Sequence, residues 1–219
     1  MQMCNSPTVT HTHALCLYSP NKSPPLTVIL QKNIRTSAPL SHNSRYNTHM
    51  NTTAQLTFLS TSVADTLSLG HAIGALLHRG DLVLLAGDLG AGKTHMSKGI
   101  VAGTGSTDLV TSPTFVFINE YRAPNQLTVF HVDLYRIESA TEIDSIGLAD
   151  ATAGSGICLI EWAERDPSLA EIPHLQLMLS HHNQTSRLIQ LSSVGPRATA
   201  LLHTLQQQPP LTIYRGDSV

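Results

Sequence analysis

The sequence predicts an α/β sandwich with a mixed, partly parallel central β-sheet flanked by helices. Two uninterrupted apolar runs, at residues 81–87 and 156–161, are typical of central strands covered on both faces. Segments with helical spacing of apolar residues alternate with such strands early in the chain, and hairpin patterns follow. This order indicates parallel pairing in the middle of the sheet and antiparallel pairing at an edge.

Composition sets limits on the class of protein. The 219 residues suit one domain with a tail, and 41% are hydrophobic, which is enough for one sizeable core. No run approaches 18 consecutive apolar residues, which excludes a membrane helix, and a net charge of −2 gives no global basic surface for nucleic acid. Three widely spaced cysteines exclude a disulfide scaffold, and the close histidine pairs, at 11/13 and 181/182, are interpreted as solvated surface residues.

The first 52 residues differ from the rest of the chain. All 15 acidic residues follow position 64, and the first fifty residues are rich in Ser, Thr, Asn, His and Pro. Such a segment buries too little apolar surface to order itself. A disordered leader, or a start codon called too early with the true start near Met50, is favoured over a transit peptide, because only two arginines and no amphipathic helix are present. Residues 53–208 are predicted to form the folded domain, and 209–219 an uncertain tail.

The domain is predicted to begin with a strand and a capped helix. Residues 55–60 alternate polar and apolar side chains, as in a half-buried strand. Ser62 is a candidate N-cap, with Asp65 at the third helical position, for an amphipathic helix over 63–78. A central strand at 81–87, a glycine-rich loop and a helix at 93–101 come next.

Later elements follow from shorter patterns. They are strands at 115–120 and 127–133 joined by a hairpin loop, a short helix at 141–149, a strand at 156–161, a hairpin with strands at 175–180 and 187–192, and a final helix at 196–206.

Residues 87–94 read GDLGAGKT, which fits the phosphate-loop pattern G-x-x-x-x-G-K-[ST]. Glycines let successive backbone N–H groups point at phosphate oxygens, and the helix that follows adds its positive end. In this pattern Lys93 reaches the β- and γ-phosphates, and the Thr94 hydroxyl binds Mg²⁺. Because a buried strand precedes the loop and a helix follows, nucleotide binding is the favoured interpretation over a chance match.

A phosphate loop needs an acidic partner for magnesium, and two acids end apolar strands. Asp133 follows VFHV and Glu161 follows CLI. Acids at such positions are unusual unless they pair or bind metal, although a pair with Arg136 or a helix cap is an alternative. The residues alone do not rank the two.

Three other positions are open to two interpretations each. Residues 111–115 (TSPTF) form either a hydroxyl-bearing loop that senses the γ-phosphate or an ordinary proline turn. Trp162 is more typical of core than of function. Arg187 starts a late strand, where it either touches the nucleotide or is simply exposed.

Five motifs in order, GDLGAGKT, SPTF, FHVDLYRI, EIDSIGL and CLIEW, resemble the TsaE (YjeE) family over residues 53–202. The resemblance implies a compact, cytoplasmic P-loop ATPase that uses ATP and Mg²⁺ and has no membrane contact. It also implies action with the TsaB–TsaD pair, in which TsaD modifies adenosine 37 of tRNAs reading ANN codons, so that tRNA is contacted only through that complex.

Carried over to this sequence, the resemblance assigns roles to individual residues. The nucleotide-binding set comprises Gly87, Gly90, Ala91, Gly92, Lys93, Thr94, His95, Thr66 and Arg187. Thr94 and Glu161 hold magnesium, Lys93 and Asp133 act in catalysis with Asp133 positioning water, and Thr114 lies in a switch-like loop (residues 111–115). The chain departs from the family at His95, commonly a threonine, and in its leader and its tail.

Two other classes of function remain compatible with a phosphate loop. One is a small-molecule phosphotransferase, which usually needs an arginine-rich lid that residues 122–136, with two arginines, do not clearly supply. The other is an adaptor that uses ATP only as a binding switch.

Overall fold

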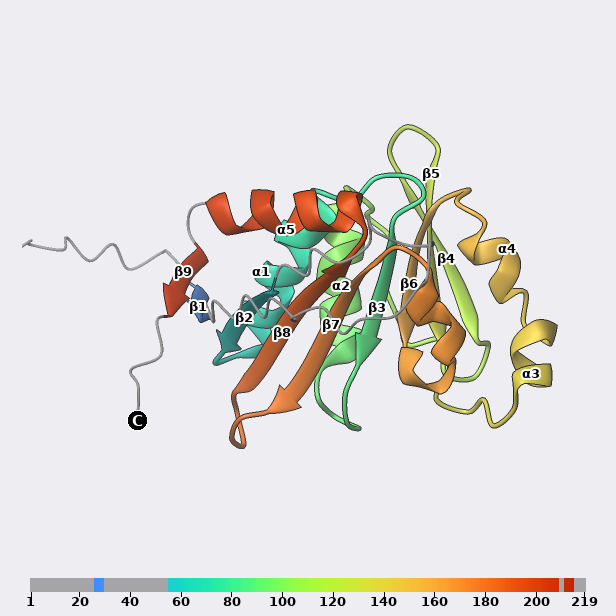
Figure 1. Ribbon diagram of the computed structural model, residues 1–219, viewed down its shortest axis with the longest axis horizontal. Coiled ribbons are helices and arrows are strands. Elements are labelled where there is room, and N and C mark those ends of the chain that lie inside the picture. Colours follow the sequence, from blue (N-terminus) through green and yellow to red (C-terminus); the bar gives the residue numbers. More distant parts are fainter. Residues whose placement is uncertain (1–25, 30–54, 209–210, 215–219) are drawn as a thin grey trace, which may run out of the picture.

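The fold is a twisted mixed sheet with helices on both faces (Figure 1). The computed structural model describes residues 26–29, 55–208 and 211–214. The strands within these residues form one sheet in the order β4-β5-β6-β3-β7-β8-β2-β1-β9. They are β1 Leu26–Ile29, β2 Gln55–Ser60, β3 Leu82–Ala86, β4 Ile118–Ala123, β5 Leu127–Asp133, β6 Ile157–Glu161, β7 His174–His181, β8 Arg187–Val194 and β9 Leu211–Tyr214.

The parallel part of the sheet lies at its centre. Strands β5, β6, β3 and β7 are mutually parallel, and β4 pairs antiparallel with β5 at one end. On the other side β8 pairs antiparallel with β7, and β2 with β8. The predicted mixed α/β sheet is confirmed, but antiparallel strands flank the parallel centre on both sides, whereas the sequence indicated one edge.

Side-chain alternation on the central strands divides the core in two. On β3, Val83 and Leu85 face helices α1 (Val63–Gly74), α2 (Lys93–Gly103) and α5 (Pro196–Gln207). Leu82 and Leu84 belong to the other cluster, with residues of α4 (Leu148–Thr152) and the 3₁₀ helices Ala163–Arg165 and Pro167–Glu171. Both clusters contain β6 residues, which explains why that strand is apolar up to its last residue, Glu161.

Helix α1 begins where its caps predict. The Ser62 hydroxyl accepts a hydrogen bond from the Asp65 N–H at 3.1 Å, and the Asp65 carboxylate accepts one from the Thr61 N–H at 2.8 Å. The helix ends at Gly74, four residues before the predicted end, because residues 75–77 continue only as a hydrogen-bonded turn. The last turn of a helix is the part that sequence patterns locate least well.

Two further boundaries differ from expectation. The strand predicted at 115–120 begins only at Ile118, because Phe117 has a φ of 66°, outside the extended region. The helix predicted at 141–149 is two short helices, α3 (Ala140–Ser145) and α4, separated by Gly147 with a φ of 78°.

The predicted leader and tail each contain a described strand. Within the leader, β1 pairs antiparallel with β2, so residues 26–29 are an exception to the prediction that 1–52 do not pack. Within the tail, β9 pairs parallel with β1. The remaining residues of 1–52 lie outside the described residues. In the part that is described, no helix has the length and apolar character needed to cross a membrane.

Glycines bring helices α1 and α2 into backbone contact. A Cβ atom on Gly99 of α2 would lie 2.4 Å from the Leu67 carbonyl oxygen of α1, and one on Gly103 would lie 2.2 Å from the His71 carbonyl oxygen. The same holds in reverse for Gly70, whose Cβ would lie 2.7 Å from the Met96 oxygen. Real Cβ atoms do not approach backbone this closely, so the spacing of the two helices requires glycine.

Gly99→Ala is therefore expected to destabilise the fold by about 1–3 kcal/mol, because the backbone of α1 must move aside. The gain in helix propensity, about 1 kcal/mol, opposes this only partly. Thermal unfolding measures the effect, with Ala102→Ser at an exposed position of the same helix as the control. An unchanged melting temperature for Gly99→Ala would contradict the close contact.

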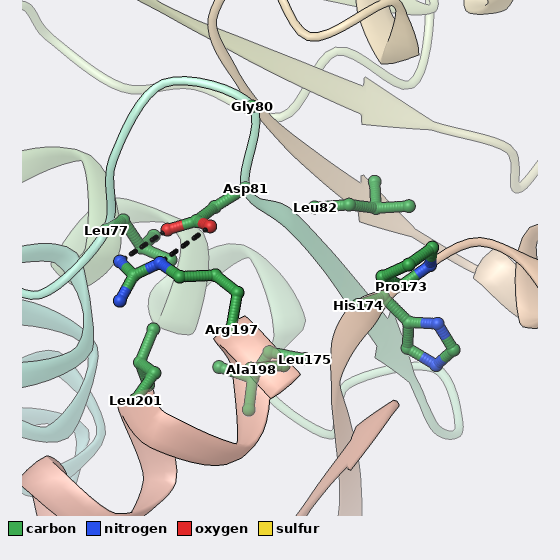
Figure 2. A pocket seen from close by; sticks show the side chains of 10 residues that line it. All are labelled: Leu77, Gly80, Asp81, Leu82, Pro173, His174, Leu175, Arg197, Ala198 and Leu201. Carbon is green, nitrogen blue, oxygen red and sulfur yellow. Dashed lines mark hydrogen bonds and ion pairs between the residues drawn. The ribbon is translucent and has the colours of Figure 1, made fainter. Parts of the chain in front are cut away.

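An arginine clamp holds three elements together at the amino ends of the parallel strands (Figure 2). Arg197, at the start of α5, donates two hydrogen bonds to the Asp81 carboxylate at 2.8 and 3.1 Å. It also donates to the Leu76 carbonyl oxygen after α1 at 2.6 Å. A small cavity of about 80 Å³, lined by Pro173, His174 and neighbouring residues, lies beside the clamp.

Arg197→Ala is expected to lower stability by about 1 kcal/mol, since a bidentate pair is lost but the arginine side chain is 42% exposed. In a chain of this size that corresponds to a fall of roughly 2–4 °C in melting temperature. Nucleotide binding at the loop 87–94, which follows the other end of β3, should not change. A fall in melting temperature above about 10 °C would show that Arg197 contributes more to stability than a partly exposed ion pair does.

Candidate functional site

A cleft of about 350 Å³ opens at the carboxyl ends of β3, β5 and β6. This is the end of an open α/β sheet where ligands bind, and the volume is within the range of small-molecule sites. Its lining residues are Leu89, Gly90, Gly92, Lys93, Thr94, His95, Ser112, Thr114, Asp133, Tyr135, Glu161 and Trp162.

The glycine-rich loop forms one wall of the cleft. Gly92 has a φ of 105° and stands at the N-cap of α2, so the helix begins directly at Lys93. A side chain would strain this conformation, which glycine adopts freely. The positive end of α2 therefore faces the cleft, as an anion-binding site requires.

The Lys93 ammonium group lies inside the curve of its own loop. Its Nζ donates to the carbonyl oxygens of Gly87, at 2.5 Å, and of Asp88, at 2.9 Å. It also lies 3.6 Å from the centre of the Trp162 ring. Burial lowers the pKa of this ammonium group from its ordinary value, and the nearby Glu161 carboxylate opposes the shift. The charge is thus held in position with few water neighbours.

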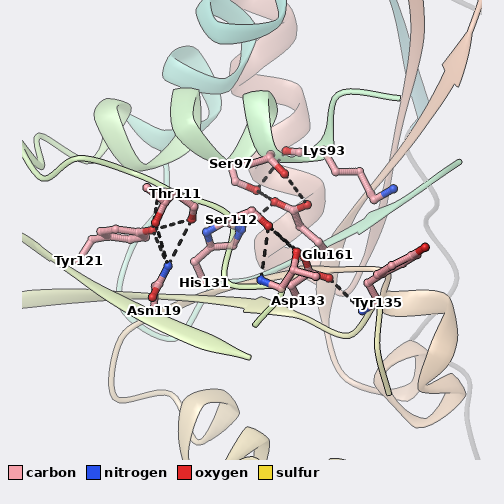
Figure 3. A network of polar contacts seen from close by, with 12 residues as sticks. Lys93, Ser97, Thr111, Ser112, Asn119, Tyr121, His131, Asp133, Tyr135 and Glu161 are labelled. Atoms are coloured by element: carbon pink, nitrogen blue, oxygen red, sulfur yellow. Dashed lines mark hydrogen bonds and ion pairs between the residues drawn. The ribbon is translucent and has the colours of Figure 1, made fainter. Parts of the chain in front are cut away.

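Glu161 is a buried carboxylate that accepts three hydrogen bonds (Figure 3). Its Oε2 accepts from the Thr94 hydroxyl at 3.0 Å. Its Oε1 accepts from the Ser97 hydroxyl at 2.9 Å and lies 2.7 Å from His131 Nε2. A hydroxyl and a carboxylate oxygen from Thr94 and Glu161 therefore lie side by side, which is the donor chemistry that Mg²⁺ prefers.

Asp133 joins the sheet to the loop at residues 111–115. Its Oδ2 accepts from the Thr114 hydroxyl at 2.5 Å and from the Ser112 hydroxyl at 3.3 Å. Its Oδ1 accepts from the Tyr135 N–H at 2.9 Å. The loop starts at a second anchor, where the Tyr121 hydroxyl donates to the Thr111 carbonyl oxygen at 3.0 Å (Figure 3).

The two acids are neighbours because their strands are in register. Asp133 and Glu161 are direct partners in the parallel β5–β6 ladder, so their side chains point to the same face. Among the described residues, no cluster of three or more His, Cys, Asp or Glu side chains is arranged to hold a metal ion by itself. A metal ion here would need further oxygen atoms from a ligand or from water.

The structure brings most of the predicted site residues to one place. Gly90, Gly92, Lys93, Thr94, His95, Thr114, Asp133 and Glu161 all line the cleft. Ala91 is buried in the loop, and Gly87 is joined to Lys93 through its carbonyl oxygen. Arg187 donates to the Gly90 carbonyl oxygen at 3.3 Å from outside the lining. Thr66 is not among the residues that line the cleft, and its buried hydroxyl pairs with Ser60 at 2.7 Å.

Comparison with known proteins adds an independent result. The family model described as "Threonylcarbamoyl adenosine biosynthesis protein TsaE" matches residues 60–189, more than half of the chain. The chain belongs to the TsaE family. The match includes the glycine-rich loop, the loop at 111–115 and both acids, whereas α5 lies beyond it.

Individual TsaE relatives align with this chain over most of their own length. A Bacillus subtilis protein named tRNA threonylcarbamoyladenosine biosynthesis protein TsaE is 35% identical over 153 residues, which are 70% of this chain and 95% of that protein. A Treponema pallidum protein of the same name is 39% identical over 122 residues, 56% of this chain and 87% of that protein. The crystal structure of Bacillus subtilis YdiB superposes with a TM-score of 0.61 at 30% identity and covers 72% of this chain and 97% of that one.

Sequence reasoning missed residues that line this TsaE-family cleft or contact Glu161 behind it. Trp162 was interpreted as core, yet its ring both packs on the second core cluster and lines the cleft beneath the lysine. Its φ of 59° turns the chain after β6. The position of Ser97 could have been predicted, because it lies one helical turn after Lys93 and residues i and i+4 share a helix face. His131 gave no signal beyond its position in an apolar strand.

Proposed function

We propose that this TsaE-family chain binds and hydrolyses ATP with Mg²⁺ in the cleft, as the ATPase subunit of tRNA threonylcarbamoyladenosine synthesis in the cytoplasm. The observation that carries the proposal is the meeting of Lys93, Thr94, Asp133 and Glu161 from three separate segments at one end of the sheet. The names of the relatives support the pathway. Adenosine 37 of tRNAs reading ANN codons is the proposed final target.

The loop and the lysine are proposed to hold the phosphates. Backbone N–H groups at the start of α2 bind phosphate oxygens, and Lys93 moves from its carbonyl partners to the β- and γ-phosphates. Its ammonium group exchanges two neutral acceptors for charged ones, which form stronger hydrogen bonds. His95 contributes its backbone N–H to the α-phosphate, while its side chain is exposed.

Thr94 and Glu161 fit the proposed Mg²⁺ site by their chemistry. Their two oxygen atoms are already 3.0 Å apart and face the cleft. A bound Mg²⁺ ion would neutralise charge on the β- and γ-phosphate oxygens. The Thr94 hydroxyl, which donates to Glu161 in this structure, would turn its lone pair toward the ion.

Asp133 is proposed to orient the attacking water. It lies beside Glu161 in register, and its Oδ2 is held by hydroxyls of the switch-like loop. When Thr114 turns toward a γ-phosphate, this oxygen becomes available to accept a hydrogen bond from water. The site then works by positioning and by electrostatic stabilisation, which account for most catalysis of phosphoryl transfer.

The proposed partners are TsaD and TsaB, with tRNA reached only through them. The test is ATP hydrolysis by the purified chain alone and with TsaD–TsaB, together with a multiple-turnover threonylcarbamoylation assay on tRNA. Inorganic phosphate release that rises with the partners, and modification that needs both this chain and ATP, are expected.

Two outcomes would overturn the proposal. Transfer of the γ-phosphate to a small molecule, with no free phosphate released, would identify a phosphotransferase. ATP binding that supports partner assembly with no hydrolysis in a single-turnover experiment would identify an adaptor that uses ATP only as a switch.

A further inference from the structure

His131 is a buried residue of β5 that has no role in the proposed mechanism. Its side chain is fully buried, and its Nε2 lies 2.7 Å from Glu161 Oε1. The ring lies on the α2 side of the sheet, two residues before Asp133 and therefore on the same face of the strand. The ring centre is 6.2 Å from that of Tyr121.

The hydrogen bonding of the ring is asymmetric. Nδ1 is buried and has no hydrogen-bond partner among the described residues, so the contact with Glu161 is the one bond made by this side chain. Burying a polar nitrogen without a partner is unfavourable, and an apolar side chain would fill this space without that penalty. The geometry is therefore better explained by the bond to Glu161 than by packing.

The bond constrains the Glu161 carboxylate. Oε1 is fixed by His131 from the sheet and by Ser97 from α2, and these two donors leave Oε2 directed at Thr94 and the cleft. Without the histidine, a single hydroxyl would hold Oε1, and the carboxylate could rotate about its last bond. Groups that orient a metal ligand in this way affect metal affinity without touching the metal.

We propose that His131 is a positioning residue that presents Glu161 Oε2 to the magnesium ion, with its Nε2–H as the donor. The inference rests on the proposed function, because it presumes that Glu161 and Thr94 hold Mg²⁺. It assigns His131 no contact with nucleotide, water or metal. Its effect is confined to the magnesium dependence of nucleotide binding.

The experiment titrates Mg²⁺ against binding of a fluorescent ATP analogue to the full chain. His131→Leu, which removes the donor but keeps an apolar side chain of similar size, is expected to raise the Mg²⁺ midpoint about 10- to 100-fold. Binding in EDTA should stay within about threefold of the unsubstituted chain, because the loop and Lys93 are untouched. His131→Gln places an amide N–H near the former Nε2 and should restore the midpoint to within about threefold.

Control variants separate positioning from packing. Ile157→Val removes one methyl group from the core on the α2 side of the sheet, the side on which His131 lies, and should leave the Mg²⁺ midpoint unchanged. If His131→Leu does not fold, His131→Asn replaces it, because both Asn and Gln are polar but only the longer Gln reaches Glu161. An unchanged midpoint in the donor-free variant, or no recovery with Gln, would overturn the inference. Failure of the unsubstituted chain to bind ATP under any condition would instead overturn the proposed function.

Discussion

Replacing Lys93 with alanine is expected to abolish ATP binding while the fold persists. The ammonium group is the one Lys or Arg cation among the residues that line the cleft, so the substitution removes the side-chain positive charge that would face the phosphates. Removing one donor that stabilises developing charge typically costs 10²–10³-fold in rate, and we expect a loss of at least about 100-fold in ATP affinity or turnover. Fluorescent-nucleotide binding and partner-stimulated hydrolysis measure it.

Stability should change little in the same variant. The lysine contacts are to two carbonyl oxygens of its own loop and to the face of Trp162, and water in the cleft can replace the first two. Lys98→Ala, on the same helix but outside the cleft lining, is the matched control and should keep full binding. Equal ATPase activity in the Lys93 and Lys98 variants would refute the phosphate-loop assignment.

Isosteric replacement of the two acids is expected to separate magnesium binding from turnover. Glu161→Gln should weaken Mg²⁺-dependent nucleotide binding about 10- to 100-fold, because the amide removes the charge that faces Thr94. Asp133→Asn should keep binding within about threefold but lower turnover about 10²- to 10⁴-fold, as for a group used mainly in the transition state. The measurements are binding at varied Mg²⁺ and single-turnover hydrolysis with the partners.

Gln and Asn are used in place of Ala because both acidic side chains are buried and hydrogen-bonded. Alanine at Glu161 would leave Thr94, Ser97 and His131 without their acceptor, whereas glutamine keeps the shape. Glu120→Gln, an exposed acid on β4, controls for net charge. If Asp133→Asn loses the magnesium dependence and Glu161→Gln keeps it, the two roles are exchanged.

Local patterns predicted the parts of the site that are contiguous in sequence. The loop at 87–94 is preceded by β3 and followed by α2 because glycine conformations and apolar strand composition are properties of a short segment. The acids could be named because each ends an apolar strand. Their adjacency could not be derived, since it depends on the β5–β6 register.

Features that depend on tertiary contacts escaped sequence reasoning. Phe117 adopts a positive φ within FVFINE, a run of aromatic and β-branched residues typical of a strand, and its carbonyl oxygen accepts the Asp133 N–H of β5 at 3.0 Å. His131 resembles any residue of a buried strand until Glu161 is placed beside it. The nucleotide contact that the resemblance implies for Thr66 stays a prediction, and the bond of its hydroxyl to Ser60 of β2 could not be derived from the sequence.

The glycine contact between α1 and α2 limits the direction in which the cleft can change shape. Helix α2 carries Lys93 and Thr94, and backbone atoms of α1 already touch it, so this wall cannot retreat when a nucleotide enters. The opposite wall, the loop at 111–115, is held to Asp133 by the Ser112 and Thr114 hydroxyls. Each of these two hydrogen bonds can break without the other. Amide hydrogen exchange should consequently stay slow along α2 in free and loaded protein, while protection around Thr114 depends on the nucleotide.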